Sequence, residues 1–164
     1  MLPSHPTLLD LLATLLILGA LAYLSVVDLR ERRLPDAVTL PVLITGLALA
    51  AWRDGHIPYA AMLGAGVGYS VFALIGEVYF RARGTEGLGL GDAKLMGALG
   101  AWLGWEALPA AVLGASLMAL VAAFAAGRRS RENIAFGPFI ALAFAGLWLA
   151  FVGADAVRLI TGSG

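Results

Sequence analysis

The chain has 164 residues, of which 60% are hydrophobic and only 13% are charged. Soluble domains have about 45–50% apolar and about 25% charged residues, so this composition indicates a membrane protein. The formal net charge of zero gives no electrostatic reason to expect a nucleic-acid partner, and the lack of cysteine excludes disulfides and thiolate chemistry. The only two histidines, His5 and His56, are far in sequence from the acidic residues discussed below. We therefore expect no metal site and no cofactor.

Six hydrophobic stretches predict a bundle of about six transmembrane helices, since one span needs about 20 apolar residues. In chain order they cover residues 7–27, 36–52, 58–80, 92–105, 107–127 and 135–159. The fourth stretch is shorter than the usual minimum, so it is either a shallow span or a segment that re-enters the membrane. The predicted fold is an all-α integral membrane protein in which residues 1–164 form one domain.

Lysine and arginine gather on alternate loops, which predicts the orientation of the chain because cytoplasmic loops carry the excess of these residues. Only Arg53 and Arg158 fall on the opposite side. The two termini are therefore predicted to lie outside the cytoplasm, with Asp28 and Asp92 at the cytoplasmic face. Nine of the eleven lysine and arginine residues fall on the predicted cytoplasmic side: Arg30, Arg32, Arg33, Arg81, Arg83, Lys94, Arg128, Arg129 and Arg131.

Asp92 follows a glycine-rich segment that covers residues 84–91. Glycine permits positive φ angles and close approach of a backbone, so such a loop could bring a peptide next to a side chain. An acidic residue at the edge of a hydrophobic span is a candidate functional residue because its charge is costly there. The simpler interpretation is a flexible loop whose Asp92 caps the N-terminus of the fourth span.

Asp28 directly follows the apolar sequence of the first span, and Asp36 follows Pro35 at the start of the second. A structural explanation exists for both residues. Asp28 could pair with Arg32 one turn later, which would contribute only about 0.3–0.5 kcal/mol. Asp36 could cap the second span, and this is the preferred interpretation of that residue.

Taken together, these segments resemble the type IV prepilin peptidases of the GxGD aspartyl protease class. The matching residues are Asp28 and Asp36 on either side of an arginine-rich loop, and the Gly89-Leu90-Gly91-Asp92 motif followed by Lys94. Asp28 and Asp92 are separated by 64 residues, a spacing typical of that family. The segment 135–139, Ala-Phe-Gly-Pro-Phe, resembles the turn that opens the final span of these enzymes.

This resemblance implies a peptidase that removes the short basic leader of type IV pilin-like precursors. The cut would follow a glycine at the cytoplasmic edge of the precursor's hydrophobic segment. The enzyme would lie in the inner (cytoplasmic) membrane with its active site facing the cytoplasm, and its partners would be the precursor and membrane lipid. Longer bacterial relatives carry an N-terminal methyltransferase region with paired cysteines. We expect a peptidase-only form without N-methylation activity, similar to those that serve Flp/Tad pili or archaeal preflagellins.

In the implied mechanism, Asp28 and Asp92 hold a water between them. One carboxylate is ionised and acts as general base, while the other is protonated and polarises the scissile carbonyl. Gly89 and Gly91 would shape the active-site loop. Lys94 is expected at the headgroup interface, with orientation of the loop or the substrate as the alternative. The candidates to receive a basic leader are the acidic residues Glu31, Asp36 and Glu86.

Other motifs predict structure rather than chemistry. Glu77 lies one turn before Arg81, and we expect an ion pair, the alternative being a third acid near the dyad. Small residues four apart permit close helix approach, and we expect them to pack inside the bundle rather than in a dimer. These pairs are Gly64 with Gly68 and Gly100 with Gly104. The tryptophans expected at the outer membrane interface are Trp52, Trp102 and Trp105.

Two other functions remain open. An intramembrane protease of the presenilin type shares the GxGD motif but cuts within the bilayer, whereas Asp28 adjoins an arginine-rich loop at the membrane edge. A non-enzymatic scaffold or transport protein could use the two acids as a proton relay. That function requires acids along a transmembrane path, whereas both aspartates are predicted at one face.

Overall fold

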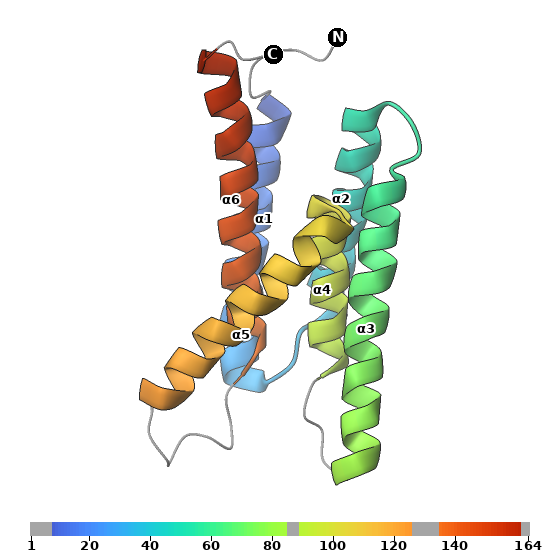
Figure 1. The fold of residues 1–164 in the computed structure, drawn as a ribbon, viewed down its shortest axis with the longest axis vertical. Helices are drawn as coiled ribbons and strands as arrows, with labels where there is room; N and C mark the ends of the chain where they lie inside the picture. The colour runs from blue at the N-terminus through green and yellow to red at the C-terminus, as the bar shows by residue number, and fades with distance from the viewer. Residues whose placement is uncertain (1–7, 85–88, 126–134, 162–164) are drawn as a thin grey trace.

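The computed structural model describes residues 8–84, 89–125 and 135–161, which form six α-helices and one short 3-10 helix (Figure 1). No strand occurs in these ranges, so the predicted all-α class is confirmed. The elements are α1 (Leu8–Glu31), α2 (Asp36–Asp54), α3 (Tyr59–Arg83), α4 (Leu90–Leu103), η1 (Trp105–Ala107), α5 (Leu108–Ala125) and α6 (Gly137–Thr161).

Five of these described helices are long and apolar enough to cross a membrane: α1, α2, α3, α5 together with η1, and α6. Helix α4 has 14 residues. At a rise of about 1.5 Å per residue it is about 21 Å long, less than the hydrocarbon thickness of about 30 Å. The predicted bounds of the fourth span, 92–105, were wrong. Helix α4 begins two residues earlier, at Leu90, and Trp105 belongs to η1.

Helix α4 lies inside the bundle and is covered by its neighbours. It packs mainly on α3 and α2 and also contacts α6, while α1 packs along α6 and α5 crosses α6 obliquely (Figure 1). Nine of its 14 residues are buried. A short helix that is apolar on all sides is stable here because the longer helices around it supply the apolar contacts.

Glycines bring the backbones of α3 and α4 into direct contact. A Cβ on Gly64 would overlap the carbonyl group of Gly100, and a Cβ on Gly100 would overlap that of Gly64. A Cβ on Gly68 would lie 2.5 Å from the carbonyl oxygen of Met96. The glycine spacing therefore serves packing inside the bundle, as predicted.

Aromatic residues fill the contact between α4 and α6. Trp102 is 6% exposed, and its indole N–H donates a hydrogen bond of 2.7 Å to the carbonyl of Val42 in α2. Its ring packs edge-on against Trp148 of α6 at 4.9 Å between centroids. The predicted interfacial position of Trp102 was wrong: the residue lies near the end of its own helix, but that helix is enclosed. Trp52 and Trp105, by contrast, are exposed.

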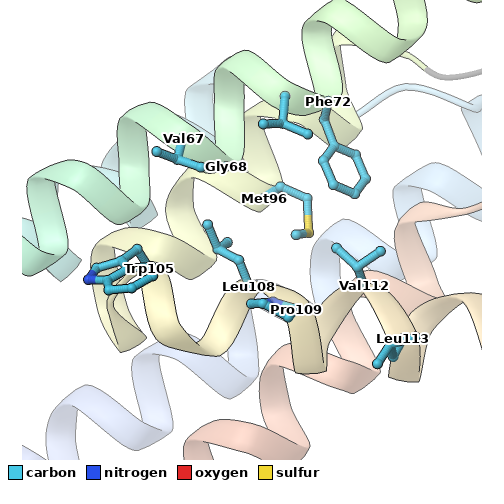
Figure 2. Close-up of a pocket in the computed structure, with 10 residues that line it drawn as sticks. Val67, Gly68, Phe72, Met96, Trp105, Leu108, Pro109, Val112 and Leu113 are labelled. Atoms are coloured by element: carbon cyan, nitrogen blue, oxygen red, sulfur yellow. The ribbon is translucent and has the colours of Figure 1, made fainter.

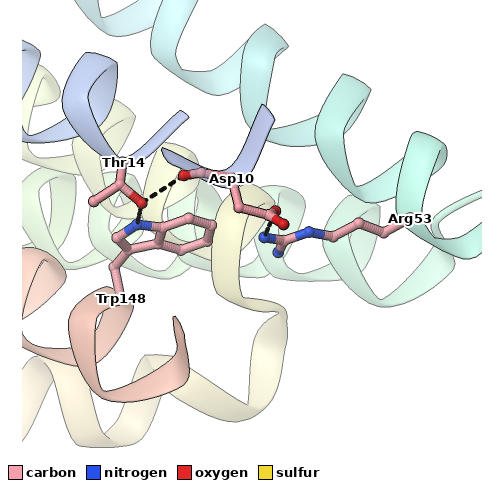
Figure 3. Close-up of polar contacts among 4 residues, drawn as sticks. All are labelled: Asp10, Thr14, Arg53 and Trp148. Carbon is pink, nitrogen blue, oxygen red and sulfur yellow. Dashed lines mark hydrogen bonds and ion pairs between the residues drawn. The ribbon is translucent and has the colours of Figure 1, made fainter. Parts of the chain in front are cut away.

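A polar cluster joins three helices at the end of the bundle where α1 begins (Figure 3). Arg53 of α2 pairs with Asp10 of α1 at 2.6 Å, and its guanidinium lies 5.1 Å from the centre of the Trp148 ring. The Trp148 N–H donates to the Thr14 hydroxyl, which donates in turn to the Asp10 carbonyl. The sequence analysis did not identify this cluster, which ties α1, α2 and α6 together far from the candidate site.

Candidate active site

Asp28 and Asp92 lie at the same end of the bundle. Helix α1 continues past the predicted limit at residue 27 and ends at Glu31, so Asp28 lies in its last turn. Asp92 is in the first turn of α4. The end of α1 and the starts of α4 and α6 lie together in Figure 1. The side chain of Asp28 is buried and that of Asp92 is half-buried.

The carboxylate of Asp28 is held by the start of α6. Its Oδ2 accepts a hydrogen bond of 3.1 Å from the backbone N–H of Gly137, the first residue of that helix. The N-terminus of a helix carries a partial positive charge and unpaired N–H groups, which favour a negative group. A Cβ at position 137 would lie 2.5 Å from Oδ2, so only glycine fits without moving the carboxylate.

This contact gives the Phe136-Gly137-Pro138 motif a function that the sequence analysis did not identify. The motif was expected only to open the last span, which it does, since α6 begins at Gly137. The contact to Asp28 joins residues 109 positions apart. The only signal in the sequence was a glycine next to a proline at the start of a helix, which says nothing about a partner in α1.

The GxGD segment places Asp92 by close packing. Gly89 precedes α4 in an extended conformation, and the helix begins at Leu90. A Cβ on Gly91 would lie 2.8 Å from the Cβ of Leu34, a buried residue in the connection between α1 and α2. Gly91 therefore lets the start of α4 approach the segment that follows Asp28. The expected N-cap position of Asp92 was wrong, since Gly89 is the N-cap residue of α4.

The two carboxylates interact electrostatically. Asp92 lies outside the five candidate spans, and burial raises the pKa of its carboxyl to about 6. The negative charge of Asp28 adds to this rise, while a backbone hydrogen bond from Gly89 opposes it. Burial and the nearby charge of Asp28 thus both favour the protonated form of the Asp92 carboxyl.

Lys94 and Asp36 form an ion pair of 2.6 Å that joins α4 to the start of α2. The predicted N-cap role of Asp36 was wrong: Pro35 occupies that position, and no side chain caps α2. Lys94 therefore has a specific partner within the protein, whereas the sequence analysis favoured a position at the headgroup interface. The pair holds the GxGD end of α4 against α2, which corresponds to the alternative of orienting the loop.

The remaining acidic candidates differ in position. Glu31 ends α1 three residues after Asp28 and is exposed at the same end of the bundle. Glu86 lies outside the described residues. The predicted pair of Glu77 and Arg81 is confirmed at 2.6 Å on the exposed surface of α3. Among the described residues, no group of three histidine, cysteine or acidic side chains gathers in a way that could hold a metal ion.

Comparison with known proteins identifies relatives over most of the chain. The model of the type IV leader peptidase family matches residues 15–124. A prepilin leader peptidase/N-methyltransferase of Burkholderia pseudomallei is 44% identical over 128 residues, which cover 75% of this chain and 41% of that protein. The protein of the same name from Dickeya chrysanthemi is 44% identical over 139 residues, with 82% and 49% covered.

The corresponding Neisseria gonorrhoeae protein is 40% identical over 147 residues, with 89% of this chain and 50% of that protein covered. The chain thus spans about half the length of the curated relatives it matches. No solved structure matches it.

Proposed function

The chain belongs to the type IV leader peptidase family, and from this premise we propose that it is a membrane aspartic endopeptidase that removes the short leader from type IV pilin-like precursors. The relatives' names combine peptidase and N-methyltransferase activities. The family model that matches the chain is that of a leader peptidase, so the peptidase activity is the one proposed here.

The observation that carries the proposal is the convergence of two acids from distant helices at one end of the bundle. The charge of Asp28 contributes to the raised pKa of Asp92, so the carboxylates act on each other. Like charges a few ångströms apart do not both ionise readily, and one proton shared by the pair leaves one base and one acid. Two acidic residues with purely structural roles at a membrane edge would not need to lie near each other.

In the proposed reaction the ionised carboxylate takes a proton from a water held between the two aspartates. The resulting hydroxide attacks the scissile carbonyl, and the protonated carboxyl donates its proton to the carbonyl oxygen. As the tetrahedral intermediate collapses, the C–N bond breaks and the acid formed in the first step protonates the leaving amine. The other aspartate takes back its proton from the gem-diol hydroxyl, which restores the starting pair. The hydrogen bond from Gly137 fixes the position of the Asp28 carboxylate through these steps.

The site is proposed to face the cytoplasm from the inner membrane. Arg30 and Arg83 lie in the last turns of α1 and α3, and Lys94 lies two residues after Asp92 in α4. An excess of cations is typical of the cytoplasmic side, so these positions support the proposed orientation. Glu31, exposed one turn from Asp28, is the proposed contact for a basic leader. A site in the last turn of α1 favours cleavage at the membrane edge over the presenilin type of cleavage within the bilayer. The proposal that the cut follows a glycine rests on the family resemblance alone.

A co-expression cleavage assay tests the function. A pilin-like precursor with a short basic leader and a glycine at the cut is expressed with the wild type, Asp28→Asn, Asp92→Asn or Asp54→Asn. Asp54 is the matched control, since it is an exposed acid at the opposite end of α2. Cleavage by the wild type and the control alone supports the dyad. Near-normal cleavage by either dyad variant contradicts the mechanism. Failure of the inserted wild type with several precursors favours the scaffold or proton-relay function.

A further inference from the structure

An apolar groove lies between α3 and α5, with α4 as its floor (Figure 2). Its volume is about 420 Å³. Val71 and Phe72 line it from α3, Met96 from α4, and Leu108 and Leu113 from α5. All the side chains that line the groove are apolar or aromatic, so it is suited to a hydrocarbon surface rather than to a polar ligand.

The groove opens toward the membrane. Helix α3 packs mainly on α4, whereas α5 packs mainly on α6, so the two walls have different supports. Leu113 on one wall is 64% exposed and Val71 on the other is 46% exposed. Because both walls belong to candidate spans, a hydrophobic helix already in the bilayer could enter sideways without passing through water.

The floor of the groove leads to the dyad. Met96 lies four residues after Asp92, and residues four apart share a face of a helix. Met96 therefore points into the groove one turn beyond the catalytic acid. From Asp92 to Leu103, the last residue of α4, the helix rises about 17 Å, and Trp105 of η1 lines the far end of the groove. One face of an apolar helix of about that length could pack along the groove with one end beside Asp92.

We propose that this groove seats the hydrophobic segment of the precursor as a helix, with its N-terminal end at Asp92 and the leader extending toward Glu31. This inference rests on the proposed peptidase function and adds the surface that positions the scissile bond. The continuity between the groove floor and Asp92 favours this occupant over a lipid acyl chain, which would have no reason to end at an acid.

Photo-crosslinking tests the location. A photoreactive phenylalanine derivative is placed at Val71 or Leu113 in the Asp92→Asn variant, which retains bound precursor, and at Ile44 of α2 as the control. Ile44 is 61% exposed, like the groove positions, but lies on another helix. We expect the precursor to crosslink at both groove positions and not at the control. Equal crosslinking at Ile44, or crosslinking to lipid alone in the groove, would overturn the proposal.

Blocking the groove tests its function. Leu113→Trp should raise the KM for full-length precursor by about tenfold or more, the effect expected when one buried apolar side chain is displaced. Ile44→Trp should leave the KM unchanged. A soluble peptide with only the leader and the cleavage site should be cleaved equally by all three enzymes. If the wild type cleaves the precursor and Leu113→Trp leaves the KM unchanged, the groove proposal is refuted while the proposed function stands. If the wild type cleaves nothing, the proposed function itself is refuted.

Discussion

Replacing Gly137 with alanine should abolish most of the activity while leaving the fold in place. The new Cβ would lie 2.5 Å from Oδ2 of Asp28 and 2.9 Å from its Cγ, whereas ordinary contacts lie at 3.4–4 Å. The carboxylate would therefore have to move by about 1 Å, and its hydrogen bond to the Gly137 N–H would be lost. A misplacement of about 1 Å at a reacting group costs on the order of 100-fold in rate, so we expect kcat to fall by about that factor with little change in KM.

The matched control is Gly146→Ala, in the same helix. A Cβ at this position meets nothing within 4 Å, and alanine is the better helix former by about 1 kcal/mol. Its cleavage rate should equal that of the wild type, with the thermal midpoint unchanged or slightly raised. Both variants would be assayed under single-turnover conditions with the same precursor, after their insertion is verified. A Gly137→Ala enzyme within twofold of the wild type would refute the argument that this contact positions Asp28.

Three further predictions follow from the described geometry. Gly91→Ala should slow cleavage on the order of tenfold, more than Gly89→Ala does, because only the former overlaps the α1–α2 connection; equal rates of the two variants would contradict this. Gly100→Ala should cost about 1–3 kcal/mol of stability through overpacking, whereas Gly66→Ala, in open space, should cost none, as thermal unfolding in detergent would show. Asp92→Asn should raise stability at pH 7.5, because the ionised carboxyl, with its pKa raised from 3.8 to about 6, is disfavoured in the folded state. The gain in stability should be at most about 3 kcal/mol, at about 1.4 kcal/mol per pKa unit. It should disappear as the pH falls from 6 to below 4, where the carboxyl is protonated in both the folded and the unfolded state. A gain that does not depend on pH would exclude this cause.

Hydropathy and charge predicted most of the helices, because the length of an apolar stretch and the cations that follow it are local properties. The second helix begins at Asp36 as expected, and the others of spanning length begin within two residues of the predicted limits. Helix α4 also begins two residues from its predicted limit, at Leu90, but it starts inside the glycine-rich segment. Glycine disfavours a helix, so the GxGD segment was assigned to a loop up to residue 91. The packing of α4 on α2 and α3 outweighs this preference and extends the helix back to Leu90.

The contacts that build the site could not be predicted in the same way, because they join residues far apart in the chain. Lys94 and Asp36 are 58 positions apart, and Gly137 and Asp28 are 109 apart. Sequence periodicity indicates which face of a helix is apolar but not which helix covers it. The resemblance to a family identified the two aspartates as candidates for one site, yet it could not show that Gly137 contacts one of them.

The separation of the two acids depends on packing far from them. Asp28 belongs to the pair of α1 and α6, while Asp92 belongs to α4, which packs mainly on α2 and α3. The contact of α4 with α6 joins these two groups, and Trp102 fills it against the rings of α6. Trp102 lies ten residues, or about 15 Å, along α4 from Asp92. The buried tryptophan thus helps to hold α4, the helix that carries Asp92, against α6.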